Sequence, residues 1–199
     1  MKHNVTAFVL AGGRSSRMGQ DKALLRHASG TTLLEHVLAI ARSVADRVTL
    51  IASREKYSSI VPGIEIVEDV YPGCGPLGGI HAALGSTSTD LNLVIATDMP
   101  NLNSELLRFL LERARSTDHV VTIPRVGELP QPLCAVYRRA FLFAAEQALR
   151  SGRYRIHTAL NQVSTGVISE AELTAAGFGA ELFANANTPG EWEALRRSC

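Results

Sequence analysis

Short apolar runs alternate with longer stretches of helical periodicity along the chain, and this alternation restricts its fold more than any other feature. The first run, Val5 to Ala11, is apolar on both faces except at Thr6, as is typical of a strand that helices cover on both sides. Further runs that fit strands lie at residues 47–52, 64–67, 91–96, 119–123 and 130–137. This pattern predicts a single α/β domain with a mainly parallel sheet, in which the run 130–137 is expected to point the opposite way.

The segments between these runs have helical spacing, and two of them carry signals for where a helix begins. Thr32 and Glu35 have the spacing of a capping box ahead of an apolar pattern of helical period. Thr188 and Pro189 supply an N-cap and a proline at the first helical position near the end of the chain. The remaining helices are expected around residues 77–84, 104–115 and 139–150.

The charge of the chain excludes several classes of partner. There are 20 Lys and Arg against 19 Asp and Glu, so the formal net charge is only +1. A balance of this kind supplies no basic field for nucleic acid and no polybasic patch for a membrane surface. In addition, no run approaches the roughly 20 apolar residues of a membrane span. From the charge and this length together, we expect neither a nucleic-acid nor a membrane partner.

The cysteines point to a reducing compartment. The chain has three, Cys74, Cys134 and Cys199, which are far apart and show neither C-x-x-C spacing nor a histidine placed to complete a zinc site. An odd number of scattered cysteines is not a disulfide framework. A cytoplasmic location is therefore expected.

The loop after the first strand has the composition of a phosphate-binding segment. It holds the glycines Gly12, Gly13 and Gly19 and the cations Arg14, Arg17 and Lys22. Ligands of open parallel sheets bind beyond the carboxyl ends of the strands, where glycines let backbone N–H groups approach a polyanion such as a triphosphate. The loop is not a Walker A motif, because no Gly-Lys-Ser/Thr follows. The alternative is a solvated basic loop, which the concentration of cations and glycines disfavours.

A carboxylate follows the strand expected at residues 91–96. Asp98 lies two residues after that strand, and Pro100 stops the regular structure. A single carboxylate that faces bound phosphates is useful chiefly as a ligand for Mg²⁺. Alternatively, Asp98 caps the helix that begins near Asn103, which the distance of five residues along the chain disfavours.

Two further features of this region allow more than one interpretation. The segment Gly73 to Gly78 matches the dinucleotide fingerprint G-x-G-x-x-G, but five residues separate it from the preceding strand and Pro76 lacks the N–H that would face a pyrophosphate. An NAD-dependent oxidoreductase is therefore disfavoured. Asp69 follows the strand at residues 64–67, and spacing alone does not decide between a ligand contact and a turn aspartate.

The run Leu10 to Leu25 resembles the opening motif of the nucleotidyltransferases that activate sugars and cofactors. The likeness rests on Leu-Ala-Gly-Gly at its start, on Arg-Met-Gly, and on Asp21-Lys22 followed by Ala-Leu-Leu. Further segments resemble, in order, the molybdenum cofactor guanylyltransferases, the MobA family. They are residues 68–69, 72–80, 97–100, 131–137 and 185–189. The resemblance covers nearly the whole chain, and the Gly-Pro-Leu-Gly-Gly and Asn-x-Asn-Thr-Pro segments are its most specific parts.

This resemblance implies a fold and a reaction. The fold is a three-layer, Rossmann-like nucleotidyltransferase domain over residues 1–199, with a mostly parallel, mixed central sheet. The reaction transfers GMP from Mg·GTP to the phosphate of molybdenum-molybdopterin, giving molybdopterin guanine dinucleotide and pyrophosphate. GTP and molybdenum-molybdopterin are the implied substrates and Mg²⁺ the cofactor, with transient contacts to proteins that deliver the cofactor or mature molybdoenzymes.

The resemblance also assigns roles to residues. Lys22, Arg17 and Asp98 are the expected catalytic residues, and Asp98 is the expected Mg²⁺ ligand. Nucleotide contacts are expected from Leu10, Ala11, Gly12, Gly13, Lys22, Asp69, Gly78 and Asp98, and contacts on the pterin side from Asn185 and Asn187. One departure is visible: some relatives have an Asn near the end of the second strand, where this chain has Ile51-Ala52-Ser53.

The residue chemistry agrees with phosphoryl transfer on its own terms. The chain has no G-x-S-x-G or paired Cys/His signature, and its six histidines show no metal-ligand spacing, so each is expected to be structural or exposed. A phosphate nucleophile is already an anion near neutral pH, so it needs charge neutralisation and alignment, not a general base. The choice of guanine rests on the resemblance alone. A cytidylyltransferase of the same cofactor and a non-catalytic nucleotide-binding module remain the alternatives.

Overall fold

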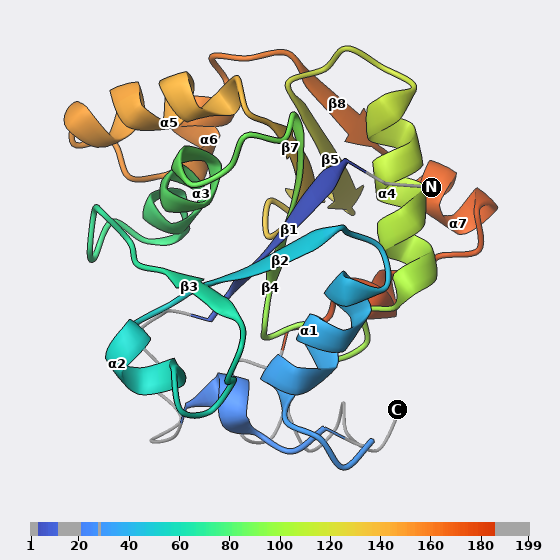
Figure 1. The fold of residues 1–199 in the computed structure, drawn as a ribbon. Helices are drawn as coiled ribbons and strands as arrows, with labels where there is room; N and C mark the ends of the chain where they lie inside the picture. The colour runs from blue at the N-terminus through green and yellow to red at the C-terminus, as the bar shows by residue number, and fades with distance from the viewer. Residues whose placement is uncertain (1–3, 12–20, 28, 186–199) are drawn as a thin grey trace.

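The computed structural model describes residues 4–11, 21–27 and 29–185 (Figure 1). Eight strands in these residues form one sheet in the order β3-β2-β1-β4-β7-β5-β6, with β8 beside β5. The strands are β1 (Val5–Leu10), β2 (Arg47–Ile51), β3 (Glu65–Val67), β4 (Leu91–Ala96), β5 (Val121–Val126), β6 (Leu129–Pro130), β7 (Cys134–Arg138) and β8 (Thr165–Ile168).

Helices cover both faces of this sheet, which gives three layers (Figure 1). The α-helices are α1 (Leu33–Arg42), α2 (Arg54–Tyr57), α3 (Pro76–Gly85), α4 (Ser104–Arg115), α5 (Phe141–Arg150), α6 (Ile156–Leu160) and α7 (Glu170–Ala175). Helices α1, α4 and α7 contribute to one hydrophobic cluster, and α3, α5 and α6 contribute to the other. The described residues also form two 3-10 turns, η2 (Lys22–Leu24) and η3 (Ala180–Phe183).

The sheet is mixed and has a parallel core, as predicted. β1 pairs in parallel with β2 and β4, β2 with β3, and β5 with β8. β7 is antiparallel to both β4 and β5, which confirms the reversed direction expected for the run 130–137. Pro130, the first residue of that run, belongs instead to β6, which forms a hairpin with β5.

Strand β1 shows why the sequence folds in this way. All six of its residues are buried. Val5, Ala7 and Val9 belong to the cluster under α1 and α4, while Phe8 and Leu10 belong to the cluster under α3. Side chains of a strand alternate between the two faces, so a strand between two helical layers must be apolar at nearly every position.

The helix signals read from the sequence are correct where the structure describes them. The Thr32 hydroxyl accepts a hydrogen bond from the Glu35 N–H at 3.2 Å, and the Glu35 carboxylate accepts one from the Thr32 N–H at 2.7 Å, which completes the capping box. α4 spans the predicted residues, and the Asn103 side chain caps it. The helix predicted after Thr188 lies outside the described residues.

Four elements were not predicted: α2, α6, α7 and β8. The three helices have between four and six residues, too few for helical periodicity to stand out. β8 reads Thr-Gly-Val-Ile and only Ile168 is fully buried, so it contains no apolar run. For α7 a signal existed, because Ser169 and Glu172 form a capping box.

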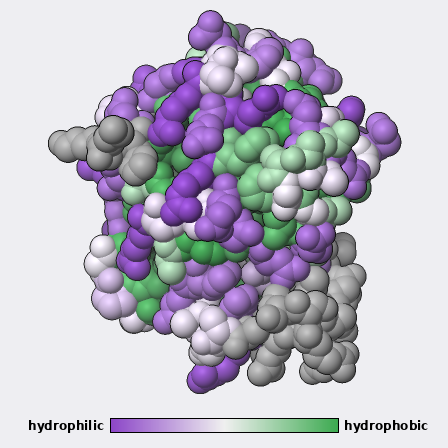
Figure 2. Space-filling view, turned by 90° about the vertical axis from the view of Figure 1, so that its right-hand side faces the viewer, coloured by the Kyte–Doolittle hydropathy of each residue, from purple (hydrophilic) through white to green (hydrophobic). Residues whose placement is uncertain are grey.

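The surface combines both kinds of residue. Figure 2 shows the face that lies on the right in Figure 1, where α4 and α7 are found, and hydrophobic patches there alternate with hydrophilic ones. In the described part of the chain, no helix has both the length and the apolar character that crossing a membrane requires.

The order of the strands produces a switch point between β1 and β4. From β1 the chain proceeds to β2 and β3 on one side, and α3 then returns it to β4 on the other side of β1. In open α/β sheets, ligands bind outside the carboxyl ends of the strands at the place where the order reverses. The fold therefore directs attention to the residues that follow β1 and β4.

The capping box predicts a measurable effect on stability. We expect Thr32→Ala to lower the free energy of unfolding by about 1 kcal/mol, because the Glu35 N–H loses its partner. Ser53→Ala is the matched control, since Ser53 precedes α2 and its side chain makes no capping hydrogen bond. Urea unfolding measures both, and equal effects for the two variants would contradict the role of the cap.

Candidate active site

The segments that follow β1, β2 and β4 leave the sheet at one edge. The hydrogen bonding continues one residue beyond each strand: the Ala11 N–H donates to the Ile51 carbonyl at 3.1 Å, and the Thr97 N–H donates to the Leu10 carbonyl at 3.3 Å. Parallel strands share a direction, so their carboxyl ends meet at this edge. Side chains from distant parts of the sequence are thereby brought to one place.

Lys22 begins the short turn η2 at this edge. Asp21 caps the turn by accepting a hydrogen bond from the Ala23 N–H at 3.1 Å, and Ala23 itself is buried. The turn is joined to α1, because the Leu33 N–H donates to the Leu25 carbonyl at 2.9 Å. The backbone of Lys22 is thus fixed by contacts of the residue before it and of residues that follow it in the chain.

The Asp98 carboxyl interacts electrostatically with the Lys22 ammonium. Burial of this carboxyl raises the pKa of Asp98, while the Lys22 ammonium and a backbone N–H oppose that shift. Asp98 does not cap α4, because the Asn103 side chain accepts the hydrogen bond of the Leu106 N–H at 2.9 Å. The local structure thus excludes the capping role of Asp98 and is compatible with a role as a ligand.

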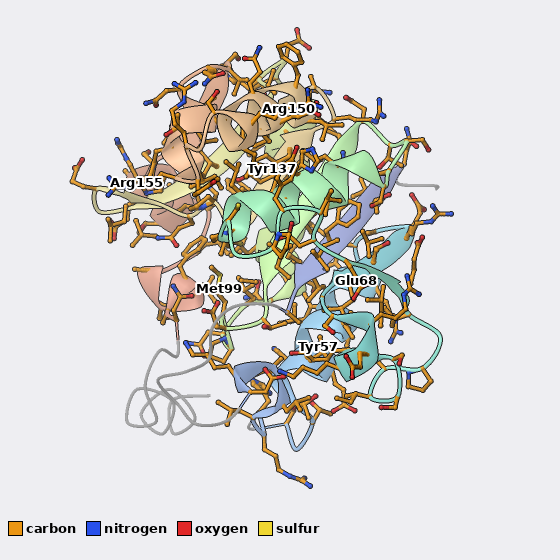
Figure 3. The ribbon with its side chains drawn as sticks, turned by 90° about the vertical axis from the view of Figure 1, so that its left-hand side faces the viewer. Tyr57, Glu68, Met99, Tyr137, Arg150 and Arg155 are labelled. Atoms are coloured by element: carbon orange, nitrogen blue, oxygen red, sulfur yellow. The ribbon has the colours of Figure 1, made fainter. Side chains whose placement is uncertain are left out.

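A contact through His27 connects the two segments that carry Lys22 and Asp98. The His27 Nε2 lies 3.2 Å from the Pro100 carbonyl oxygen, and the His27 ring stacks on that of His36 with centroids 3.9 Å apart. Met99, between Asp98 and Pro100, is buried in the core (Figure 3). His27 and His36 thus have the structural role expected of the histidines.

Asp69 makes the turn contact that was one of the two interpretations the sequence left open. Its Oδ1 accepts a hydrogen bond from the Tyr71 N–H at 2.8 Å, which is a turn contact. Its carboxyl also lies against the first turn of α3: a Cβ placed on Gly78 would be 2.6 Å from Oδ2. Burial raises the pKa of Asp69. A side chain at position 78 would displace the Asp69 carboxylate from this place.

The segment Gly73 to Gly78 does not have the structure of a dinucleotide fingerprint. β3 ends at Val67 and α3 begins only at Pro76, so the glycines do not form a direct turn from strand to helix. Gly75 is the N-cap with φ of 69°, a left-handed conformation that glycine adopts without strain. The segment serves to bring the N-terminus of α3 next to Asp69.

The described part of the C-terminal segment returns to this edge. The Asn101 side chain donates to the Glu181 carbonyl at 2.9 Å, and Phe183 is buried in the same hydrophobic cluster as Met99. Asn185 follows as an exposed residue. The expected site residues Gly12, Gly13, Arg17 and Asn187 lie outside the described residues.

Two observations limit what this site can hold. Within residues 4–11, 21–27 and 29–185, no three His, Cys, Asp or Glu side chains form a group that could bind a metal ion. In the segment Ile51-Ala52-Ser53, Ile51 and Ala52 are buried in the core and Ser53 is exposed.

Sequence reasoning missed the residues that support Lys22. Tyr57 and Lys56, both from α2, contact the Asp21 carboxylate at 2.5 Å and 2.7 Å. The motif contained Asp21, but nothing in the sequence connected it with a short helix more than thirty residues later.

Comparison with known proteins shows which family this chain resembles along its length. The model of the MobA-like NTP transferase domain matches residues 7–165. A probable molybdenum cofactor guanylyltransferase of Pelotomaculum thermopropionicum is 36% identical over 186 residues, which cover 94% of this chain and 89% of that protein. The molybdenum cofactor guanylyltransferase of Syntrophotalea carbinolica is 30% identical, with 96% of this chain and 90% of that protein covered.

Solved structures show the same fold. The molybdopterin-guanine dinucleotide biosynthesis protein A of Archaeoglobus fulgidus superimposes with a TM-score of 0.86 at 27% identity, covering 98% of both chains. A cytidylyltransferase of Thermus thermophilus superimposes with a TM-score of 0.70 at 16% identity, a likeness of fold alone. Because the domain model spans most of the chain and full-length relatives share more than 30% of its residues, this chain belongs to the MobA-like NTP transferase family.

Proposed function

We propose that this protein transfers GMP from GTP to the phosphate of molybdenum-molybdopterin. The products are molybdopterin guanine dinucleotide and pyrophosphate. The observation that carries the proposal is the electrostatic interaction of Lys22, which follows β1, with Asp98, which follows β4, at the switch point between these strands. The names of relatives that match nearly the full chain support the choice of GTP and molybdopterin.

The reaction requires charge neutralisation and alignment. An oxygen of the molybdopterin phosphate forms a bond to the α-phosphorus of GTP, and the bond from that phosphorus to the bridging oxygen of the β-phosphate breaks. Pyrophosphate leaves with the electron pair. Both reactants are anions, so Lys22 and Arg17 reduce their repulsion and stabilise the charge that develops on the leaving group. No side chain needs to remove a proton.

Asp98 is the residue that would hold Mg²⁺. When bound, Mg²⁺ would supply positive charge that neutralises the substrate phosphates during the transfer. The Lys22 ammonium favours the ionised form of the Asp98 carboxyl, against the effect of burial. Burial nevertheless raises the pKa of Asp98 overall, and a bound cation would favour the ionised carboxylate further.

The remaining residues divide between the two substrates. The nucleotide contacts Leu10, Ala11, Gly12, Gly13, Asp69 and Gly78, and the pterin side contacts Asn185 and Asn187. The bond between Asn101 and Glu181 supports this arrangement, because it keeps the segment that leads to Asn185 beside the loop after β4. Proteins that deliver molybdopterin or receive the product would approach the same edge.

Removal of either charged group is the first test. We expect Asp98→Ala and Lys22→Ala each to reduce the rate of GMP transfer by at least about a hundredfold, as is usual when one preorganised charge-stabilising group is lost. Asp118→Ala is the control, because Asp118 is exposed and precedes β5 at the opposite edge of the sheet. Near-normal transfer by both site variants would contradict the assigned roles.

The choice of nucleotide is tested by comparing GTP, CTP and ATP. We expect pyrophosphate release only when a molybdopterin acceptor and Mg²⁺ are present, with GTP preferred, and we expect EDTA to abolish it. A preference for CTP would make the protein a cytidylyltransferase. Binding of GTP with no pyrophosphate release would identify a non-catalytic module.

The contact of Asp69 with Gly78 predicts an effect on nucleotide binding. Gly78→Ala places a methyl group 2.6 Å from Asp69 Oδ2, so the carboxylate must move, and we expect the KM for GTP to rise about tenfold with a smaller change in kcat. Gly85→Ala is the control in the same helix, since a Cβ there meets no atom within 4 Å. An unchanged KM for Gly78→Ala would remove Asp69 from the nucleotide site.

A further inference from the structure

The Asp21 carboxylate receives a set of contacts that the proposed chemistry does not itself use. The Tyr57 hydroxyl donates to Oδ2 at 2.5 Å, and the Lys56 ammonium lies 2.7 Å from the same oxygen. The other oxygen accepts the Ala23 N–H at 3.1 Å. Tyr57 is 3% exposed, and the Asp21 side chain is 14% exposed. A half-buried carboxylate with three donors is held in one orientation.

The charge states follow from these contacts. Burial tends to raise the pKa of Asp21, but the hydrogen bonds from Lys56 and Tyr57 outweigh it, and the pKa is lowered. Burial and the neighbouring Asp21 carboxylate both raise the pKa of Tyr57. At neutral pH Asp21 is therefore ionised and Tyr57 keeps its proton, so the hydroxyl is the donor.

Helix α2, which carries Tyr57, is anchored at its other end beside Asp69. The Arg54 N–H donates to Glu68 Oε1 at 3.0 Å, and the Arg54 guanidinium donates to the Ile66 carbonyl at 2.7 Å. Figure 3 shows Tyr57 between α2 and the blue η2 segment, with Glu68 near β3. A helix of four residues is not stable by itself. Its position depends on these contacts, which connect the end of β3 with η2.

We propose that Tyr57 is a positioning residue for the transfer reaction, which acts through Asp21 to hold the backbone of Lys22 beside Asp98. The inference rests on the proposed function, since it assigns Lys22 a role toward the triphosphate. Asp21 caps η2 and is covalently joined to Lys22, so fixing its carboxylate fixes the direction in which the Lys22 side chain leaves the backbone. A preorganised cation loses less conformational entropy when the nucleotide binds.

The test compares Tyr57→Phe with the wild-type protein. We expect the Kd for Mg·GTP, measured without an acceptor, to rise about three- to tenfold, less than the tenfold or more expected for loss of a direct hydrogen bond to a charged group, because Tyr57 acts on GTP only through the position of Lys22. Tyr154→Phe is the control, because Tyr154 is half exposed and lies between α5 and α6. A purely structural role of Tyr57 would lower the Tm but leave the Kd of the folded protein unchanged, which would overturn the inference.

A double-mutant cycle shows whether the effect passes through Lys22. In the Lys22→Ala background there is no ammonium to position, so we expect Tyr57→Phe to change the Kd less than twofold. The same fold-change in both backgrounds would contradict the inference. The proposed function is judged separately: wild-type protein that binds GTP but transfers no GMP would contradict that function, while the comparison of Kd values still decides the role of Tyr57.

Discussion

The position of β1 between two parallel neighbours is the constraint on which the site depends. β1 is hydrogen-bonded to β2 on one side and to β4 on the other, and every one of its side chains is buried. This arrangement places the segment that leads to Lys22 and the segment that contains Asp98 at the same edge of the sheet. Loss of either pairing would separate the two charges, whatever the local sequence around each of them.

In the proposed reaction, the site stabilises charge with groups that are already fixed in position. The partly buried contacts that support these groups are polar. The Lys22 ammonium opposes the effect of burial on Asp98, and Lys56 and Tyr57 oppose it on Asp21. Such groups do not have to reorganise when a charged substrate arrives, which is the main source of rate enhancement in phosphoryl transfer. The phosphate nucleophile of the proposed reaction is already an anion, so no general base is needed at this edge.

Much of the fold and part of the site followed from local patterns. The strands β1 to β4, the capping box of α1 and the full extent of α4 were predicted, because burial on both faces and caps leave a signature within a few residues. The place of Asp98 just after the buried strand β4 was predicted, and its role as a Mg²⁺ ligand stays a prediction. The short elements α2, α6, α7 and β8 were not, since four to six residues are too few to show a period.

The sequence by itself determined the alternation of strands and helices, the concentration of cations and glycines after β1, and the family to which the chain is similar. These depend on residues that are neighbours along the chain. Only the tertiary structure decided that Tyr57 meets Asp21, that His27 reaches the Pro100 carbonyl, and that Gly78 admits Asp69. Each of these contacts joins residues that are distant in sequence, and their meeting is set by strand order and helix packing, which no local spacing encodes.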